Sequence, residues 1–304
     1  MVGPSRRRSS SAVVAGVLMG IGMCACSPSS PTAASTLKAT EYYVSLGDSY
    51  AAGFQPTGRN GVGHTTTNGF AYQVPGLATP RGYHLTLVNF GCGGATTASI
   101  LNTPGCPLLG PGAPHYPHQS QASAAEAFLQ QHPGKIGLVT VSIGGNDVTE
   151  CASSSDPIGC VAKAVTTINV NLSILLPALR AASGPNVPIV GITYPDVVLG
   201  DYLSPNAADR TLASLSATAF KSVINPALQK QYAAVGATFV DVTSATGAYT
   251  PFTQTTQLAP YGTIPIAVAK VCQLTYFCQY GDIHPRTVGY TEIAQLVTAA
   301  LPAR

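Results

Sequence analysis

The chain has 304 residues, of which 45% are hydrophobic and only 9% are charged, and it contains no tryptophan. Its formal charge of +3 comes from the first residues, because without Arg6, Arg7 and Arg8 only 12 of the 15 basic residues remain, against 12 acidic ones. A chain that is otherwise neutral and has no basic run gives no support to nucleic acid as a partner.

The N-terminal residues are typical of an export signal. The three arginines form a positive n-region, and Ala12–Met23 forms an apolar h-region. That run is shorter than the roughly 18 residues expected of a membrane span. We therefore expect the protein to be exported, and to be either extracellular or anchored in the cell envelope.

Cys26 is a candidate for a lipid anchor. It follows the small residue Ala25 and precedes a stretch rich in Ser, Pro and Thr, which resembles the lipobox of bacterial lipoproteins. Cys24 fits less well because the bulky Met23 precedes it. A lipid anchor at Cys26 is favoured over an ordinary secretory signal with incidental cysteines. The sequence predicts a signal peptide with a lipobox over 1–26, a disordered tether over 27–40 and a folded domain over 41–304.

Six further cysteines lie in the expected domain. They could pair in 15 ways, but short separations favour pairing between neighbours, and an oxidising compartment favours disulfides over a metal site. No pair has Cys-x-x-Cys spacing and no histidine cluster accompanies them, so metal binding is disfavoured. The expected pairs are Cys92–Cys106, Cys151–Cys160 and Cys272–Cys278.

Short apolar runs alternate with helical stretches along the domain, which predicts an α/β fold with a mostly parallel sheet covered on both faces. The expected strands are Tyr42–Leu46, Leu85–Asn89, Gly137–Ile143, Val187–Thr193 and Thr238–Val242. The expected helices are Gly69–Ala78, Thr97–Leu101, Gln119–Gln131, Val161–Ala182, Pro205–Val235 and Thr287–Leu301.

Two details of the later elements can be predicted. Ser204 and Pro205 suit a helix start, and Pro226 should kink or divide the helix that follows. The stretch Thr243–Tyr280 breaks the alternation of strands and helices, and its Pro, Gly and Thr content predicts a loop tied down by two cysteines at one edge of the sheet.

Several polar segments directly follow expected strands. Ligands of such folds bind beyond the carboxyl ends of the strands, so these segments should converge on one rim. They are Ser49, Gly91–Thr96, Gly144–Asp147, Tyr194–Asp196 and Asp241.

Ser49, in the stretch YVSLGDSYAAG, is either a helix-capping turn residue or a nucleophile. A serine nucleophile needs a base, and His284 is the best candidate because it precedes the last helix with Asp282 beside it. The other five histidines lie in loops or at element edges. Taken alone, Asp282 and His284 could equally be the capped start of a helix.

Two segments could supply donors to the oxyanion of a tetrahedral intermediate. The glycine turn NFGCGGATT leaves the Gly94 N–H free to approach a substrate, and SIGGNDV places the amide of Asn146 after another strand. Each feature also has an ordinary structural interpretation, as a turn glycine and as an Asx-turn asparagine.

The ordered set G-D-S, a glycine turn followed by A-T-T, G-G-N-D and D-x-H-P resembles the SGNH/GDSL hydrolase superfamily from Tyr42 to Leu301. It is most similar to secreted actinobacterial lipases and esterases with three consecutive disulfides. The resemblance implies a three-layer α/β/α sandwich around a five-stranded parallel sheet of flavodoxin type. It implies Ser49 as nucleophile and His284 as general base and then general acid. Gly94, Asn146 and the N–H of Ser49 itself would form the oxyanion hole.

The chain departs from the family at the third member of the triad. Family members commonly place the acid three residues before the histidine, whereas Asp282 is two before His284. In some members a backbone carbonyl orients the imidazole instead. We favour Asp282 for this role. Asp48 and Asp147 are expected to brace the loops through hydrogen bonds to backbone amides.

The leading functional hypothesis is a secreted or lipid-anchored serine esterase or lipase that needs no cofactor or metal. The expected partners are a small-molecule or lipid ester and, through Cys26, a membrane; the protein is expected to be a monomer that binds no nucleic acid. Alternatives are a carbohydrate acetyl-esterase of the same superfamily and a non-catalytic surface binding lipoprotein. Apolar residues of the loops at the carboxyl edge of the sheet could bind the acyl group: Leu108, Leu109, Val197, Val198, Leu199, Phe252, Leu258, Ile264 and Ile266.

Overall fold

The computed structural model describes residues 3, 12–14 and 40–304. The predicted signal peptide, the lipid-anchor candidate Cys26 and the predicted tether therefore lie almost wholly outside the described residues. Every helix and strand described below belongs to one compact unit, Lys38–Arg304.

The strands are β1 (Glu41–Gly47), β2 (Phe54–Pro56), β3 (Gly63–Thr65), β4 (Leu85–Asn89), β5 (Ile136–Ser142), β6 (Ile189–Ile192), β7 (Thr238–Val240), β8 (Thr255–Leu258) and β9 (Gly262–Pro265). The α-helices are α1 (Ser49–Ala52), α2 (Phe70–Ala78), α3 (Thr97–Asn102), α4 (Gln121–Gln131), α5 (Gly145–Thr149), α6 (Pro157–Ser183), α7 (Ala207–Ala219), α8 (Asn225–Ala234), α9 (Val242–Ala245), α10 (Ile266–Leu274), α11 (Phe277–Tyr280) and α12 (Thr287–Ala299). All five predicted strands and the predicted helices are present, with ends shifted by a few residues.

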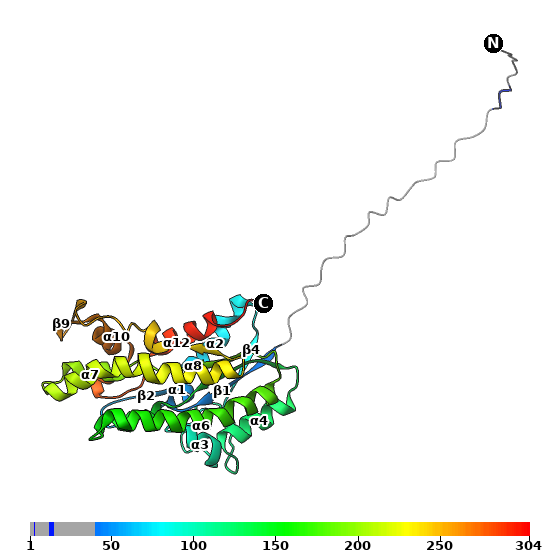
Figure 1. The fold of residues 1–304 in the computed structure, drawn as a ribbon. Coiled ribbons are helices and arrows are strands. Elements are labelled where there is room, and N and C mark those ends of the chain that lie inside the picture. Colours follow the sequence, from blue (N-terminus) through cyan, green and yellow to red (C-terminus); the bar gives the residue numbers. More distant parts are fainter. Residues whose placement is uncertain (1–2, 4–11, 15–39) are drawn as a thin grey trace. The chain divides into compact units, whose positions relative to one another are not determined.

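The main sheet has the strand order β4-β1-β5-β6-β7, and every neighbouring pair is parallel. Numbered along the chain within this sheet, the order is 2-1-3-4-5, which is the flavodoxin-like arrangement. Helices α2 and α12 cover one face, and α3, α4 and α6 cover the other (Figure 1). The predicted three-layer α/β/α sandwich with a five-stranded parallel sheet is confirmed.

The core lies on both faces of the central strand β5, all of whose residues are buried. Val139 and Val141 face the cluster formed with α4 and α6, whereas Leu138 faces the cluster formed with α2 and α12. Successive side chains of a strand point to opposite faces, so a strand covered by helices on both sides is mostly apolar on both faces, with Thr140 and Ser142 as buried polar exceptions in β5. This explains why the strands appear in the sequence as continuous apolar runs.

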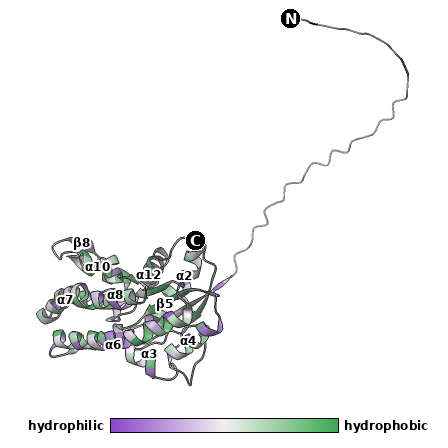
Figure 2. Ribbon diagram, turned by 45° about the vertical axis from the view of Figure 1, so that its right-hand side comes forward, coloured by the Kyte–Doolittle hydropathy of each residue, from purple (hydrophilic) through white to green (hydrophobic). Residues whose placement is uncertain are grey.

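Helix α6 is the one described helix that is long and apolar enough to cross a membrane. Its buried residues Val165, Leu172 and Leu179 belong to the core cluster against the sheet. Both hydrophobic and hydrophilic residues occur along it (Figure 2). In this fold α6 is therefore a helix of the folded domain.

The long helix expected over Pro205–Val235 is divided, as predicted from Pro226, but the division lies before the proline. A π-helical turn, Phe220–Ile224, separates α7 from α8, and the Asn225 N–H bonds to the Phe220 carbonyl. Such π turns are frequent at functional sites. The predicted start is wrong: α7 begins at Ala207 and is capped by Asn206, whose side chain accepts from the Ala208 N–H.

The segment Thr243–Tyr280, predicted as a loop, contains regular structure. It holds the antiparallel hairpin β8–β9 and the helix α10. Buried residues of α10, among them Val268 and Val271, pack into two small clusters next to the main core. These elements are only four to nine residues long, so their local sequence signals are weak and tertiary packing decides their structure.

Six cysteines of the described residues form three disulfides, Cys92–Cys106, Cys151–Cys160 and Cys272–Cys278, with Cα–Cα distances of 5.7, 5.4 and 5.1 Å. The expected pairing between neighbours is confirmed. The second bridge joins the turn after α5 to the first turn of α6, and the third joins α10 to α11. The first two bridges therefore tie down the segments that follow β4 and β5.

Candidate active site

Ser49 lies at the carboxyl end of β1, next to the point where the strand order reverses between β1 and β5. Gly47 allows this sharp exit, because its φ is +141° and a Cβ there would come within 2.1 Å of the Ser142 carbonyl oxygen. Asp48 is the N-cap of α1 and accepts from the Tyr50 N–H, so Ser49 itself does not cap the helix. Ser49 is left as the first residue of α1, with 7% of its surface exposed.

The three predicted triad residues lie together. The Oγ of Ser49 is 2.8 Å from Nε2 of His284, and Nδ1 of the same ring is 2.7 Å from Oδ1 of Asp282. The serine comes from the start of the domain and the other two residues from just before its last helix. This hydrogen-bonded chain is the arrangement that lets a histidine take a proton from a serine.

The short spacing between Asp282 and His284 is explained by a local turn. Oδ1 of Asp282 accepts from the backbone N–H of His284 at 2.9 Å, as in an Asx turn, and the same oxygen contacts the ring Nδ1. The partner of Nδ1 is thus the carboxylate and not a backbone carbonyl. Helix α12 begins at Thr287 with Arg286 as its N-cap, so Asp282 and His284 do not cap it.

The carboxylate of Asp282 is held in its ionised form. Burial alone would raise the pKa of Asp282, but the hydrogen bonds from the His284 ring and backbone, together with the charge of a protonated imidazole, outweigh burial and hold the pKa below its usual value. The loop is fixed from the other side, because the Tyr50 hydroxyl donates to the Ile283 carbonyl at 2.6 Å. The Phe54 ring lies 4.5 Å from the His284 ring, centre to centre.

The predicted oxyanion donors are placed at strand ends as expected, though not around a single cavity. Asn146 lies with Ser49 in a large cavity, whereas Gly94 borders a smaller one of about 190 Å³ beside Ala95. The two segments are linked at Ala95, the residue after Gly94, whose carbonyl accepts from Nδ2 of Asn146 at 2.7 Å. An amide nitrogen carries two hydrogens, so Asn146 keeps one for a substrate.

The backbone N–H groups at the site are also available. Within residues 40–304, the N–H groups of Ser49 and Gly94 have no protein acceptor. Gly94 has a φ of +80° and open space where a Cβ would be. Free backbone N–H groups at a turn and at the first residue of a helix are suitable donors to an oxyanion.

Asp147 and Asp48 brace the loops, as predicted. Asp147 accepts from the backbone N–H of Thr97 at 2.9 Å and from its hydroxyl at 2.5 Å, which joins α5 to the first residue of α3. Asp48 accepts from the Tyr50 N–H and from the Tyr194 hydroxyl at 2.6 Å. Burial raises the pKa of Asp48 to about 6, although both hydrogen bonds oppose the shift.

Sequence reasoning missed two supporting residues. Tyr194 was expected only as part of a rim segment, yet its hydroxyl fixes Asp48 next to the nucleophile. Gln121 pairs with the backbone of Gly47 through both its amide oxygen and its amide nitrogen, at 2.7 and 2.9 Å, and so fixes the end of β1. Both contacts join residues more than 70 positions apart, and no local pattern indicates them.

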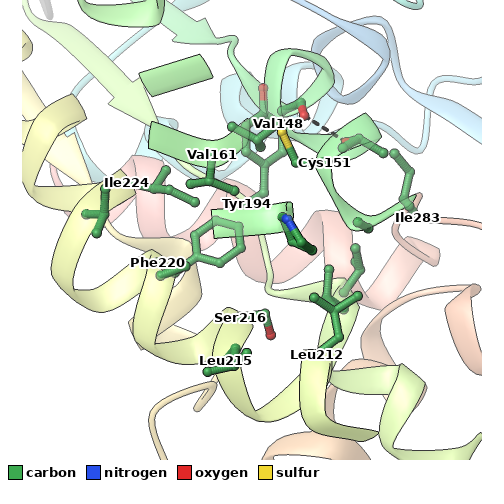
Figure 3. Close-up of a pocket in the computed structure, with 18 of the residues that line it drawn as sticks. Val148, Cys151, Val161, Tyr194, Leu212, Leu215, Ser216, Phe220, Ile224 and Ile283 are labelled. Carbon is green, nitrogen blue, oxygen red and sulfur yellow. Dashed lines mark hydrogen bonds between the residues drawn. The ribbon is translucent and has the colours of Figure 1, made fainter. Parts of the chain in front are cut away.

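A cavity of about 470 Å³ opens beside Ser49 (Figure 3). Its walls are mainly apolar and come from α5, the first turns of α6, α7 and the π-helical turn, where Phe220 points into the cavity. Of the nine apolar loop residues predicted to bind an acyl group, only Val197 and Val198 line it. The prediction was otherwise wrong, because residues such as Leu199 and Ile264 are buried in small clusters instead.

A family model described as GDSL-like Lipase/Acylhydrolase matches residues 43–297. The chain belongs to this family. No curated protein matches the sequence.

Solved structures of similar fold include three lipolytic enzymes. An extracellular lipase from Streptomyces rimosus is 20% identical, covering 86% of this chain and all of that one, with a TM-score of 0.49. A phospholipase A1 from Streptomyces albidoflavus is 18% identical with the same coverage and a TM-score of 0.48. A lipase from a goat rumen metagenome is 15% identical, covers 86% of this chain and 97% of that one, and has a TM-score of 0.50.

Among the described residues of this GDSL-like hydrolase, no group of three His, Cys, Asp or Glu side chains could hold a metal ion. The Ser49 hydroxyl contacts the His284 imidazole, which contacts the Asp282 carboxylate, and the Asn146 amide lines the same cavity as Ser49. This set is the one that acyl transfer through a serine requires.

Replacing Asn146 with alanine is expected to lower kcat by about 100- to 1,000-fold with little change in KM, because the amide would act on the oxyanion of the transition state. Steady-state hydrolysis of p-nitrophenyl butyrate measures this. Asn102→Ala, an exposed asparagine on α3, is the matched control. A loss of less than fivefold in Asn146→Ala would mean that the amide does not contact the oxyanion.

Asp196, which follows β6, should make the stability of the folded protein depend on pH. Its side chain is fully buried and accepts from the Ser216 hydroxyl at 2.8 Å. Burial raises the pKa of Asp196 to about 7, although this hydrogen bond opposes the shift. An unfolded aspartate titrates near 3.9, so the folded state binds the proton more tightly. The stability that Asp196 contributes is therefore present below about pH 4 and is lost as the pH rises to about 7.

Asp196→Asn cannot ionise. We expect its unfolding free energy, relative to that of the wild type, to rise by about 3 to 4 kcal/mol when the pH is raised from 4 to 8. Urea unfolding at both pH values measures the difference. Asp156→Asn, at the exposed N-cap of α6 where asparagine also caps well, is the control. If the unfolding free energies of the wild type and Asp196→Asn changed equally with pH, the expectation would be contradicted.

Proposed function

We propose that this member of the GDSL family is an exported serine ester hydrolase that cleaves esters of apolar acyl groups through an acyl-enzyme on Ser49. The observation that carries the proposal is the 2.8 Å contact between the Ser49 Oγ and the His284 Nε2, at the edge of a large apolar cavity.

The proposed reaction has two halves. In the first, His284 takes the proton of Ser49 as Oγ attacks the ester carbonyl, and Ser49 N–H, Gly94 N–H and the Asn146 amide stabilise the oxyanion. The tetrahedral intermediate collapses when His284 returns the proton to the departing alcohol. In the second half, His284 activates a water molecule that hydrolyses the acyl-enzyme. Asp282 stays ionised throughout and balances the charge of the imidazolium, which fits its lowered pKa.

The cavity favours an acyl group larger than acetyl. A methylene group occupies a few tens of Å³, so an acetyl group would leave most of the 470 Å³ cavity empty. The apolar walls would bind an alkyl chain by removing it from water. These observations favour a lipase or esterase of longer acyl esters over the carbohydrate acetyl-esterase. The intact hydrogen-bonded triad likewise favours an enzyme over a non-catalytic binding protein.

An active-site label tests the proposal. A fluorophosphonate that carries an alkyl chain should add one label to the wild type and none to Ser49→Ala, as measured by intact mass. Ser173→Ala, an exposed serine on α6, should still be labelled and controls for the loss of an ordinary serine. If the folded wild-type protein takes no label, the proposed function is wrong.

Export is supported by the three disulfides, which persist in oxidising compartments. The lipid anchor at Cys26, the monomeric state and the lipid ester as substrate stay proposals. The intact mass of the protein recovered from its producing cells tests the anchor, since acylation of Cys26 adds the mass of its lipid chains.

A further inference from the structure

We propose that the mouth of the cavity docks on a lipid surface, from which the enzyme takes its ester substrate. The inference rests on the proposed function for the identity of the substrate. The surface, here called the apolar rim, consists of Ile158, Leu215 and Val223.

The apolar rim is formed by exposed hydrophobic side chains. Ile158 is 71% exposed, Leu215 46% and Val223 43%, and all three also line the cavity. Ile158 lies in the first turn of α6, whereas Leu215 lies on α7 and Val223 on the π-helical turn. Large side chains therefore remain exposed on three elements that line the same cavity. Exposed apolar groups that continue into a binding cavity mark an interaction surface more often than scattered ones do.

The rim carries little charge. Among the lining residues whose side chains are described, Asp48 and Asp201 are the only ionisable acids, and no lysine or arginine lines the cavity. Asp48 is buried beside Ser49, and its carboxylate accepts from the Tyr194 hydroxyl. Apolar side chains around a cavity with so few charged groups are suited to uncharged lipid.

A lipid surface is the occupant that fits both the rim and the site. A protein partner or a second copy seated on Ile158, Leu215 and Val223 would cover exposed side chains that also line the cavity, and so would obstruct the entry of an ester there. A lipid surface covers the same side chains and supplies an alkyl chain to the apolar walls behind them. The two roles then use one continuous apolar surface, from the rim to Phe220 and Leu212 inside the cavity (Figure 3).

The absence of tryptophan from the chain allows a direct test. A single reporter is introduced by Leu215→Trp, in a chain that carries Ser49→Ala so that no lipid is hydrolysed. The control reporter is Val170→Trp on α6, where valine is 57% exposed but lines no part of the cavity. Both proteins are mixed with phosphatidylcholine vesicles whose acyl chains are brominated, which quench tryptophan on contact.

With vesicles present, the Leu215→Trp protein should emit at shorter wavelength and lose at least half of its fluorescence, while the Val170→Trp protein should emit as it does in buffer. The N-terminal residues are shared, so binding through them alone would affect both reporters alike. Adding Ile158→Ser and Val223→Ser to the Leu215→Trp protein should lower its vesicle partition coefficient about tenfold or more, because burial of two apolar side chains is lost.

Equal responses of the two reporters, or no response at position 215, would overturn the inference. So would a concentration-dependent dimer that forms in the absence of lipid and is abolished by Ile158→Ser with Val223→Ser, because the rim would then bind a second copy. The proposed chemistry is tested separately by fluorophosphonate labelling in solution. If the wild type takes the label but the position-215 reporter does not respond, docking alone is refuted. If the wild type takes no label but the reporter inserts into vesicles, the chemistry alone is refuted.

Discussion

Replacing His284 with alanine is expected to lower kcat for p-nitrophenyl butyrate by about 10⁵- to 10⁶-fold. Nε2 of His284 lies 2.8 Å from the Ser49 Oγ, and no other histidine is bonded to that oxygen among the described residues. Without the imidazole, the serine keeps its proton at neutral pH and is a weak nucleophile. Initial rates at saturating ester give kcat, and thermal unfolding shows whether the fold is retained.

The matched control is His132→Ala. His132 follows α4, where its ring stacks on Phe128 and its Nδ1 contacts the Phe128 carbonyl at 2.8 Å. The variant loses an aromatic contact but nothing at the active site, so its kcat should stay within about twofold of the wild type. If His284→Ala retained more than about a hundredth of the rate, the base would have to be another group, and the proposed mechanism would be wrong.

Asp282→Asn is expected to lower kcat by about 10³- to 10⁴-fold with little change in KM. The carboxylate accepts from Nδ1 at 2.7 Å, which keeps the proton on that nitrogen and leaves Nε2 free to accept from Ser49. An asparagine that presents its NH₂ group to the ring favours the opposite tautomer, in which Nε2 carries the proton and cannot act as a base. Steady-state kinetics above pH 7 measure the loss.

Two further measurements separate this role from a structural one. Asp241→Asn, at the end of β7 and without contact to His284, should keep its kcat. The lowered pKa of Asp282 contributes stability above about pH 4, the range where an unfolded aspartate is ionised, and that stability is lost at more acidic pH. The wild type should therefore exceed Asp282→Asn in stability at neutral pH, with the difference shrinking on acidification. A kcat near that of the wild type in Asp282→Asn would mean that another acceptor orients the imidazole.

The fold was predictable, and the contacts among Ser49, His284 and Asp282 were expected, because both depend on local sequence patterns. A strand buried on two faces is mostly apolar at successive positions, so five such runs between helices predict a parallel sheet. The carboxyl ends of parallel strands lie at one edge, which brings residues such as Ser49 and Asn146 to the same rim. The contact of Asp282 with the His284 ring depends on an Asx turn between residues only two positions apart.

The tertiary structure alone decided the substrate cavity and its supports. Its walls come from α6, α7 and the π-helical turn, and hydrophobic residues there have the same sequence pattern as residues that pack in a core. Which of them face an open space depends on how two helices far apart in the chain sit against each other. The contacts of Tyr194 with Asp48 and of Gln121 with Gly47 arise in the same way. Hydrophobic periodicity therefore determined the sheet, and the ordered motifs determined the candidate site residues. Helix packing, a sum of many long-range contacts, decided the shape of the cavity.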